Sequence, residues 1–241
     1  MNNYCHCCLL MLWARAMRAI ITDPRIIKDV MDQRDSNPHQ ISGKDFDRVF
    51  FSKCAWAVYT AGIKFKMVEN KWKAIEEAFL HWDYQQVCRN EDNVRTAALS
   101  VVKNIRKANA TIKIAQWMCE TGWVTIRKRL LDGLTQDGLG NFVPGHELIA
   151  YLDERPMIGE TNAIFLAKMI GYDLAKPDIL LKRLATKFGY PPNKNGVQQL
   201  ATDISQLVLQ RISVVETVLW NACNSKKDDL GFKCPTCGKE Y

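Results

Sequence analysis

The sequence LDERPMIGETNAIFLAKMIGYDLAKPDILLKRLATKFGY, residues 152–190, decides the predicted fold. Its Pro156–Gly159 segment has the residue types of a tight turn, and the residues before and after the turn have helical character. The second helix presents a periodic apolar face and ends at a glycine. That face consists of Ala163, Leu166, Ala167 and Ile170, and Gly171 follows it. The segment therefore predicts a helix, a short turn and a helix.

Such a hairpin can bind a phosphate group. Its turn can direct unpaired backbone N–H groups, and the positive end of the second helix, at a phosphate of a nucleic acid. Contacts of this kind hold the DNA backbone without reading its sequence. The residues that would make them are Met157, Ile158, Gly159 and Thr161. The alternative is a turn that only connects two helices.

A second helix start follows the hairpin at Lys176-Pro177-Asp178. Proline suits the first turn of a helix, and the helix dipole favours a carboxylate at that end. The next apolar stripe is Leu181, Leu184, Ala185 and Phe188. Taken by itself, this pattern predicts that Asp178 caps the helix.

The rest of the chain is predicted to be helical as well. Apolar residues recur at intervals of three and four in several segments, for example Val101 to Ala115 and Val208 to Leu219. No segment shows the sustained two-residue alternation of a strand, and a glycine-rich stretch at 135–145 predicts a loop. We therefore expect an all-α protein without internal repeats.

Composition limits the class of protein further. The chain has 241 residues, of which 47% are hydrophobic and 24% charged, so it is long enough to bury a core and too apolar for disorder. The net charge of +7 suits a polyanionic partner. The apolar run at 9–13 is too short for a signal peptide or a membrane span, and nine cysteines are an odd number. These features predict a reducing, cytoplasmic location.

Cysteine pairs stand at both ends of the chain. Cys5 and Cys8 form one C-x-x-C knuckle. Cys234 and Cys237 form another, which contains a proline and is followed by a glycine. Two such knuckles can complete a closed, structural zinc site with four thiolates. At the first knuckle His6 and Cys7 are competing ligands, and an apolar helix start is the alternative. The remaining residues Cys54, Cys88, Cys119 and Cys223 are predicted to be small buried apolar residues.

The hairpin, the short linker and the helix-opening aspartate together resemble the helix-hairpin-helix DNA glycosylase superfamily. The segments 56–79 and 104–110 look like 3-methyladenine DNA glycosylase I. The segments 158–168, 176–178 and 218–220 look closest to the α-glutamyl/putrescinyl thymine pyrophosphorylase-like branch, which is associated with hypermodified bases of phage DNA. The resemblance spans roughly residues 44–222.

The resemblance implies a two-lobed, all-α fold with a zinc site that ties the termini. Residues 41–175 would form a central helical barrel that carries the hairpin, and 1–40 with 176–241 a terminal helical lobe with the zinc-binding tail. Asp178 would be the catalytic carboxylate, facing the cleft between the lobes. Lys107 and Lys176 would contact DNA, and Trp56, Tyr59 and Trp72 would line the substrate pocket, unless these aromatic residues are simply core.

Some residues depart from the superfamily's pattern. Met157 replaces the first glycine of the hairpin, and Thr161 stands where glycosylases with lyase activity carry a nucleophilic lysine. Helix 46–60 has Ser52 and Lys53 where 3-methyladenine DNA glycosylase I has its pocket glutamate. These differences favour a monofunctional glycosylase over a lyase, and they disfavour alkyladenine as the substrate.

The function predicted from the sequence is therefore excision of a bulky modified pyrimidine from double-stranded phage DNA, leaving an abasic site. The base would be a glucosylated hydroxymethylcytosine or a substituted thymine. The enzyme would be a monomer that takes part either in anti-phage defence or, if encoded by a phage, in DNA modification. Two alternatives remain open: a repair glycosylase for alkylated purines, and a helix-hairpin-helix protein that binds DNA without catalysis.

Overall fold

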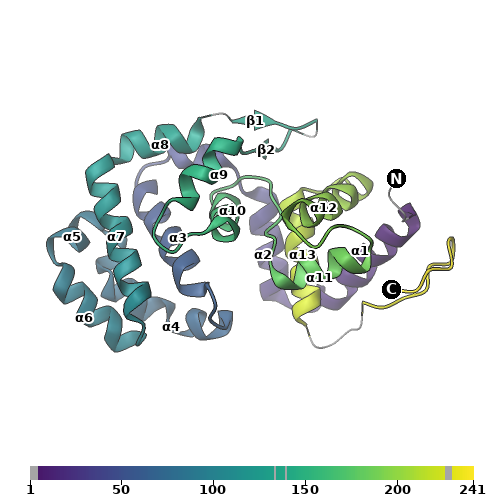
Figure 1. Ribbon diagram of the computed structural model, residues 1–241, viewed down its shortest axis with the longest axis horizontal. Coiled ribbons are helices and arrows are strands. Elements are labelled where there is room, and N and C mark those ends of the chain that lie inside the picture. Colours follow the sequence, from purple (N-terminus) through teal and green to yellow (C-terminus); the bar gives the residue numbers. More distant parts are fainter. Residues whose placement is uncertain (1–4, 133, 139, 226–229) are drawn as a thin grey trace. The chain divides into compact units, whose positions relative to one another are not determined.

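The computed structural model describes residues 5–132, 134–138, 140–225 and 230–241, and most of these residues are helical (Figure 1). The chain divides into two compact units. The central unit comprises Asn37–Thr135 and Pro144–Ile170, and the terminal unit Met1–Ser36, Gln136–Val143 and Gly171–Tyr241. The prediction of an all-α protein is confirmed. The predicted domains, 41–175 and 1–40 with 176–241, stay a prediction, because a compact unit is not by itself a functional domain.

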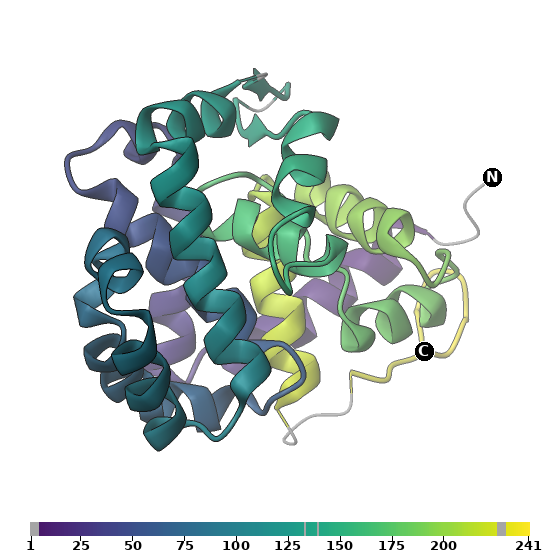
Figure 2. The ribbon, with the colours of Figure 1, turned by 60° about the vertical axis from the view of Figure 1, so that its left-hand side comes forward.

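The central unit is built around the long helix α7, which is visible along its whole length in Figure 2. Helices α3, α5, α6 and α8 pack against it, and α3 also contacts α10. The helices of this unit are η1 (Pro38–Ser42), α3 (Phe46–Thr60), α4 (Phe65–Ala78), η2 (Leu80–Trp82), α5 (Tyr84–Arg89), α6 (Glu91–Val101), α7 (Ile105–Thr121), α8 (Trp123–Leu131), α9 (His146–Asp153) and α10 (Glu160–Met169).

The terminal unit joins the two ends of the chain in one hydrophobic core. Residues of α1 and α13 pack against each other, and α12 contacts both. Asp173 is fully buried and accepts hydrogen bonds from the backbone N–H groups of Ile212 and Ser213, so it caps α13. The helices are α1 (His6–Ile20), α2 (Pro24–Asp35), α11 (Ile179–Lys187), α12 (Lys194–Val208) and α13 (Ile212–Asn224).

Short extended segments interrupt the helical pattern. The predicted loop at 135–145 contains a hairpin of two-residue strands, β1 (Thr135–Gln136) and β2 (Phe142–Val143). Near the C-terminus, Phe232 and Tyr241 exchange backbone hydrogen bonds of 3.1 and 2.8 Å, which folds 232–241 back on itself. Strands this short give too little alternation for a sequence pattern to detect.

Among the described residues, we find no helix that combines the length and the apolar character needed to cross a membrane.

Candidate functional site

The predicted hairpin is present in the central unit. Helix α9 ends at Asp153, and α10 begins after Gly159, which stands at its N-cap with an extended conformation and provides no capping side chain. Ile158 is fully buried and its N–H donates to the carbonyl of Arg155 at 2.9 Å, which closes the turn. The first N–H groups of a helix have no acceptor within the helix. The N–H groups at Gly159 and Thr161 therefore stand at the positive end of α10, where a phosphate can bind.

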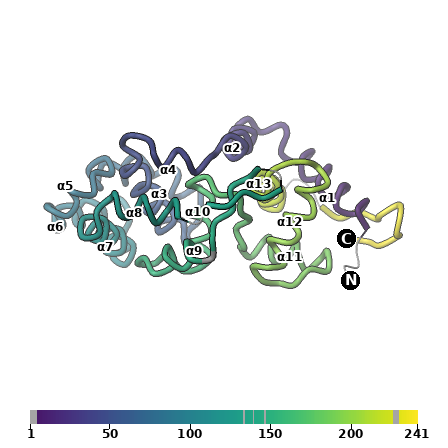
Figure 3. Tube along the Cα trace, turned by 90° about the horizontal axis from the view of Figure 1, so that it is seen from above, coloured from purple at the N-terminus to yellow at the C-terminus, as the bar shows by residue number. Residues whose placement is uncertain are grey.

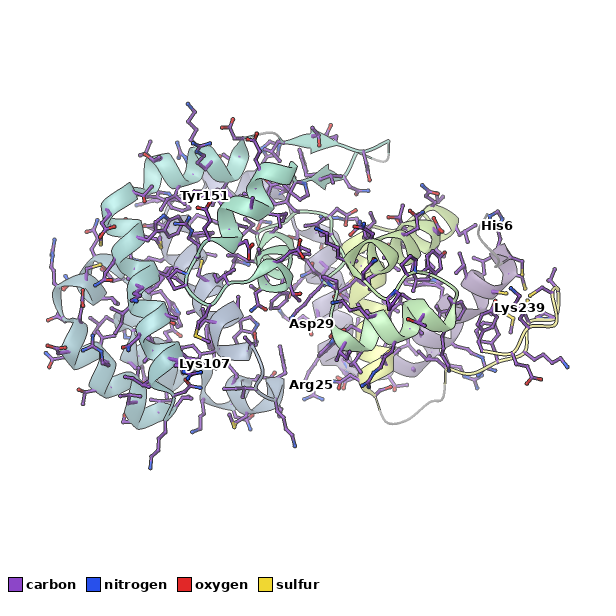
Figure 4. The ribbon with its side chains drawn as sticks, viewed as in Figure 1. His6, Arg25, Asp29, Lys107, Tyr151 and Lys239 are labelled. Atoms are coloured by element: carbon purple, nitrogen blue, oxygen red, sulfur yellow. The ribbon has the colours of Figure 1, made fainter. Side chains whose placement is uncertain are left out.

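Arg155 holds the turn in place, which the sequence did not indicate. Its Nε donates to the carbonyl of Tyr151 at 3.1 Å. Its guanidinium carbon lies 4.5 Å from the centre of the Trp117 ring and 5.1 Å from that of Tyr151, within the range of cation–π attraction. Figure 4 labels Tyr151 on α9. The arginine thus connects the hairpin to α7.

Met157 occupies the most strained position of the turn. Its φ of 59° lies in the left-handed region, which glycine adopts freely and other residues rarely adopt. Its side chain is 42% exposed, so burial recovers little of the conformational cost. A glycine would therefore suit this position of the turn better than methionine.

We expect Met157→Gly to leave the fold intact and to raise the free energy of unfolding by at most about 1 kcal/mol. Relief of left-handed strain is partly offset by the greater freedom of glycine in the unfolded chain. Met157→Val should lower stability by more than about 1 kcal/mol, because a β-branched residue tolerates positive φ poorly. Urea unfolding of both variants checks this. Equal stabilities for the two would show that the turn is not strained.

Asp178 lies at the N-cap of α11 in the terminal unit. Its Oδ1 accepts a hydrogen bond from the N–H of Leu181 at 2.9 Å, and its Oδ2 accepts one from the indole Nε1 of Trp220. The carboxylate is half-buried. Because one donor comes from the backbone of α11 and the other from a side chain on α13, the carboxyl group is fixed in one orientation.

Two side chains near Asp178, those of Trp220 and Cys223, were not predicted from the sequence to lie there. Trp220 lies in the 218–220 segment that carried part of the resemblance, yet only the fold brings its indole to a residue 42 positions away. Burial, followed by the negative charge of Asp178, raises the pKa of the Cys223 thiol to about 11. Cys223 therefore stays neutral beside the carboxylate at pH 7.

Lys176, predicted to contact DNA, precedes this site and is half-buried. Its carbonyl accepts the N–H of Asp178 at 2.9 Å, so its backbone helps to shape the start of α11.

The aromatic residues predicted for the substrate pocket belong to one cluster in the central unit. Trp56 and Trp72 are both half-buried and pack edge to face with ring centres 4.6 Å apart. Trp72 also stacks on Trp82 at 4.9 Å. Both tryptophans stay candidates for a pocket wall.

Tyr59 requires a correction. Its side chain is only 1% exposed and packs against Phe79, and burial raises the pKa of its hydroxyl. It lies on the inner face of α3, so it is a core residue and does not line a surface pocket in this structure.

Lys107 also requires a correction. Lys107, labelled in Figure 4, is 3% exposed, and its Nζ donates to the carbonyl of Ala61 at 2.7 Å and to that of Val58. These carbonyls belong to the C-terminal end of α3, where a cation is favoured. Burial lowers the pKa of Lys107. The prediction of a DNA contact is wrong for this residue, because its ammonium group is buried and donates to these carbonyls within the central unit. The neighbouring Lys103 and Arg106 are exposed.

Replacing Lys107 by methionine should therefore destabilise the chain by about 2 kcal/mol, because the buried carbonyl of Val58 and the half-buried carbonyl of Ala61 lose their donor. Arg106→Met, an exposed control on the same helix, should change stability by less than about 0.5 kcal/mol. Thermal and urea unfolding measure both. A stable Lys107→Met variant with reduced DNA affinity would reverse the correction.

The four cysteines of the two knuckles come together in the terminal unit. Their Sγ atoms all lie within 4.8 Å of one another, with 3.2 Å between Cys5 and Cys8, 3.5 Å between Cys5 and Cys234, and 3.4 Å between Cys8 and Cys237. A tetrahedron of thiolates with metal–sulfur bonds of about 2.3 Å has sulfurs roughly 3.8 Å apart. The group could therefore hold a metal ion.

Backbone hydrogen bonds shape the polypeptide around the cluster. The N–H of Cys8 donates to the carbonyl of Cys5 at 3.0 Å, and that of Gly238 to the carbonyl of Cys234 at 2.9 Å, so each knuckle is a closed turn. Figures 1 and 3 show the C-terminal segment beside the start of α1. Among the described residues, the group of four contains neither His6 nor Cys7, so these two do not replace Cys5 or Cys8 as ligands in this structure.

The thiols of the cluster differ in pKa. Burial raises the pKa of Cys8 to about 12. Burial opposes ionisation of Cys234 as well, but the backbone N–H groups of Cys237 and Thr236 favour it and bring the pKa to about 6. A bound cation would be needed to keep all four groups as thiolates.

Comparisons with known proteins bear on the fold. No protein-family model matches the sequence, and none of the curated proteins compared with it is a match. Among solved structures, the 8-oxoguanine DNA glycosylase of Methanocaldococcus jannaschii is similar, with a TM-score of 0.57 and 15% identity. The similarity covers 88% of this chain and 92% of that protein.

The chain has a DNA glycosylase fold. At this level of identity the similarity establishes the architecture and leaves the chemistry to be argued from the residues. The predicted fold class is thereby confirmed, while the predicted superfamily and its branch stay proposals.

Proposed function

We propose that this chain is a DNA N-glycosylase, and the observation that carries the proposal is Asp178. Its carboxylate is held by donors from α11 and α13, and the superfamily resemblance implies that this aspartate is the catalytic one. The similarity to a solved DNA glycosylase supports the same class of activity. Double-stranded DNA is the proposed partner, and the net charge of +7 favours it.

The chemistry assigned to Asp178 follows from the reaction. Cleavage of an N-glycosidic bond develops positive charge on the sugar and negative charge on the departing base. A carboxylate beside C1′ stabilises the sugar cation or activates a water molecule. Because the Leu181 N–H and the Trp220 indole already orient Asp178, little reorganisation is needed when the charge develops.

DNA binding is assigned to the hairpin. The N–H groups at the start of α10 would hold one phosphate, and Met157 would lie at the edge of this contact. The target base would leave the duplex and be received by an aromatic wall, for which Trp56 and Trp72 are the candidates.

A monofunctional reaction fits the residue at 161. Threonine has no amine to form a Schiff base with the sugar, so the product would be an abasic site in an unbroken strand. We also propose that zinc occupies the four-cysteine group and has a structural role, since a four-thiolate site has no open position for water.

The proposed substrate is a bulky modified pyrimidine of phage DNA, such as glucosylated hydroxymethylcytosine or a substituted thymine, removed by a cytoplasmic, monomeric defence enzyme. The resemblance of 158–168 and 176–178 to the thymine pyrophosphorylase-like branch supports this class of base. A bulky substituent also offers contacts that unmodified bases lack.

The test is incubation of the purified chain with four DNAs: unmodified, methylated, glucosylated at hydroxymethylcytosine, and substituted at thymine. Released bases are identified by mass spectrometry, and strands are analysed before and after alkali. The expected result is release of a modified pyrimidine and strand breakage only after alkali. Release of 3-methyladenine alone would assign the chain to alkylation repair. Binding to every DNA without release would make it a DNA-binding protein.

Trp220 is proposed as the positioning residue for Asp178. Trp220→Phe keeps the ring and removes the N–H donor, so we expect the rate of base release to fall about 10-fold at unchanged DNA affinity. In a chain that already carries Asp178→Asn, the same substitution should have no further effect on the rate. A matched control, Trp13→Phe, changes a half-buried tryptophan of the same unit. Equal, additive losses in both backgrounds would show that Trp220 acts through stability alone.

A further inference from the structure

Two cysteines outside the four-cysteine group lie in contact in the central unit. Cys88 is on α5 and Cys119 on α7, two helices that pack against each other and lie side by side in Figures 1 and 2. Their Sγ atoms are 2.8 Å apart, and both thiols are free. A disulfide bond is about 2.05 Å long, so a shift of less than 1 Å would join the two sulfurs.

The two thiols differ in access, contrary to the prediction that both are buried. Cys119 is exposed, whereas Cys88 is half-buried. Cys54 is fully buried in the same unit, and burial raises its pKa. Cys119 is therefore the thiol in this unit that a dissolved reagent can reach first.

We propose that Cys88 and Cys119 form an oxidation site that reacts with low-molecular-weight disulfides of the glutathione type. The Cys119 thiolate attacks one sulfur of the reagent, forming a mixed disulfide and releasing one thiol. Cys88 then loses its proton and attacks the Cys119 sulfur, which expels the second thiol. The two protein thiols are oxidised to one disulfide, and the reagent is reduced to two thiols, so atoms and electrons balance.

The order of these steps follows from the surroundings of Cys88. Burial, then the adjacent Cys119 thiol and the charges of Glu91 and Glu120, raise the pKa of Cys88 to about 12. Cys88 is thus a poor first attacker but is already in contact with its target once Cys119 has reacted. Proximity of this kind makes the second step effectively intramolecular.

The disulfide would tie α5 directly to α7 and enclose α6 in the covalent loop between them. A cross-link over 31 positions restricts the unfolded chain, so oxidation should raise the melting temperature of the central unit by about 10 °C. Thioredoxin-like or small-molecule reductants would reverse it. The inference concerns the central unit alone and does not depend on the chain being a glycosylase.

The experiment equilibrates the full, metal-loaded chain in glutathione buffers of increasing oxidised fraction, blocks free thiols, digests with trypsin and maps the products. Cleavage yields peptides 74–89 and 114–127, each with a single cysteine, so a disulfide between them is unambiguous. The expected result is one 74–89/114–127 cross-link, reversed by dithiothreitol, with Cys54 still reduced and the melting temperature raised.

Single substitutions distinguish the role of Cys119, which attacks the reagent, from that of Cys88, which attacks the mixed disulfide. Cys88→Ser should accumulate a glutathione adduct on Cys119, because the resolving thiol is missing. Cys119→Ser should leave Cys88 unmodified under the same conditions. The proposal is overturned if the cross-link is absent in fully oxidised buffer while the native chain is folded by circular dichroism. It is also overturned if Cys119→Ser forms the Cys88 adduct as readily as the native chain forms the disulfide.

Discussion

Asp178→Asn is expected to slow base release by about 10²- to 10⁴-fold while DNA affinity changes less than about 3-fold. The carboxylate would meet the positive charge that develops on the sugar only in the transition state, and an amide cannot neutralise that charge. Asparagine is a good N-cap, so α11 should still begin at this residue. Single-turnover release from modified DNA and binding by fluorescence anisotropy measure the two quantities.

The matched control is Asp23→Asn. Asp23 caps α2 in the same unit and accepts a hydrogen bond from the N–H of Arg25 at 3.0 Å, so the same chemical change is made at a second helix start. This variant should release base at the native rate. If Asp178→Asn were as active as Asp23→Asn, Asp178 would be a cap and nothing more, and the proposed mechanism would be wrong.

The second large effect concerns the termini. The double substitution Cys234→Ser with Cys237→Ser should reduce bound zinc from one equivalent to none and lower the melting temperature of the terminal unit by more than about 10 °C. Loss of the site removes the metal's contribution to folding and releases 232–241 from α1. Elemental analysis and calorimetry provide the readouts, and a folded fraction should keep its rate of base release.

Cys7→Ser is the matched control for the metal site. Cys7 lies between Cys5 and Cys8 in the chain yet outside the group of four sulfurs, so this variant should keep its full equivalent of zinc. Full zinc occupancy in the double variant would contradict the assigned ligands. Iron in place of zinc, with the visible absorption of a cluster, would contradict the proposed metal.

A comparison of prediction and structure shows which features depend on local sequence. The helices, the hairpin turn at 156–159 and the two cysteine knuckles were predictable, because apolar spacing, turn residues and ligand spacing act over a few residues. Asp178 at a helix start was predictable for the same reason, since Pro177 precedes it and an apolar stripe follows.

What tertiary structure decided was the surroundings of individual side chains. Lys107 and Arg106 are adjacent in a basic run, yet one ammonium is buried against the end of α3 and the other side chain is exposed. Tyr59 and Trp56 share a helix, yet only Tyr59 faces the core. A spacing pattern gives the face of a helix, but which partner covers that face depends on residues far along the chain.

The remaining contacts join residues distant in sequence. The indole of Trp220 reaches Asp178 across 42 positions, Cys88 meets Cys119 across 31, and Cys5 meets Cys234 across 229. By itself the sequence determined the all-α class, the hairpin, the aspartate at a helix start and the two knuckles. Only the packing of helices determined what orients that aspartate and which thiols touch, because such contacts arise from the global arrangement and leave no local periodicity.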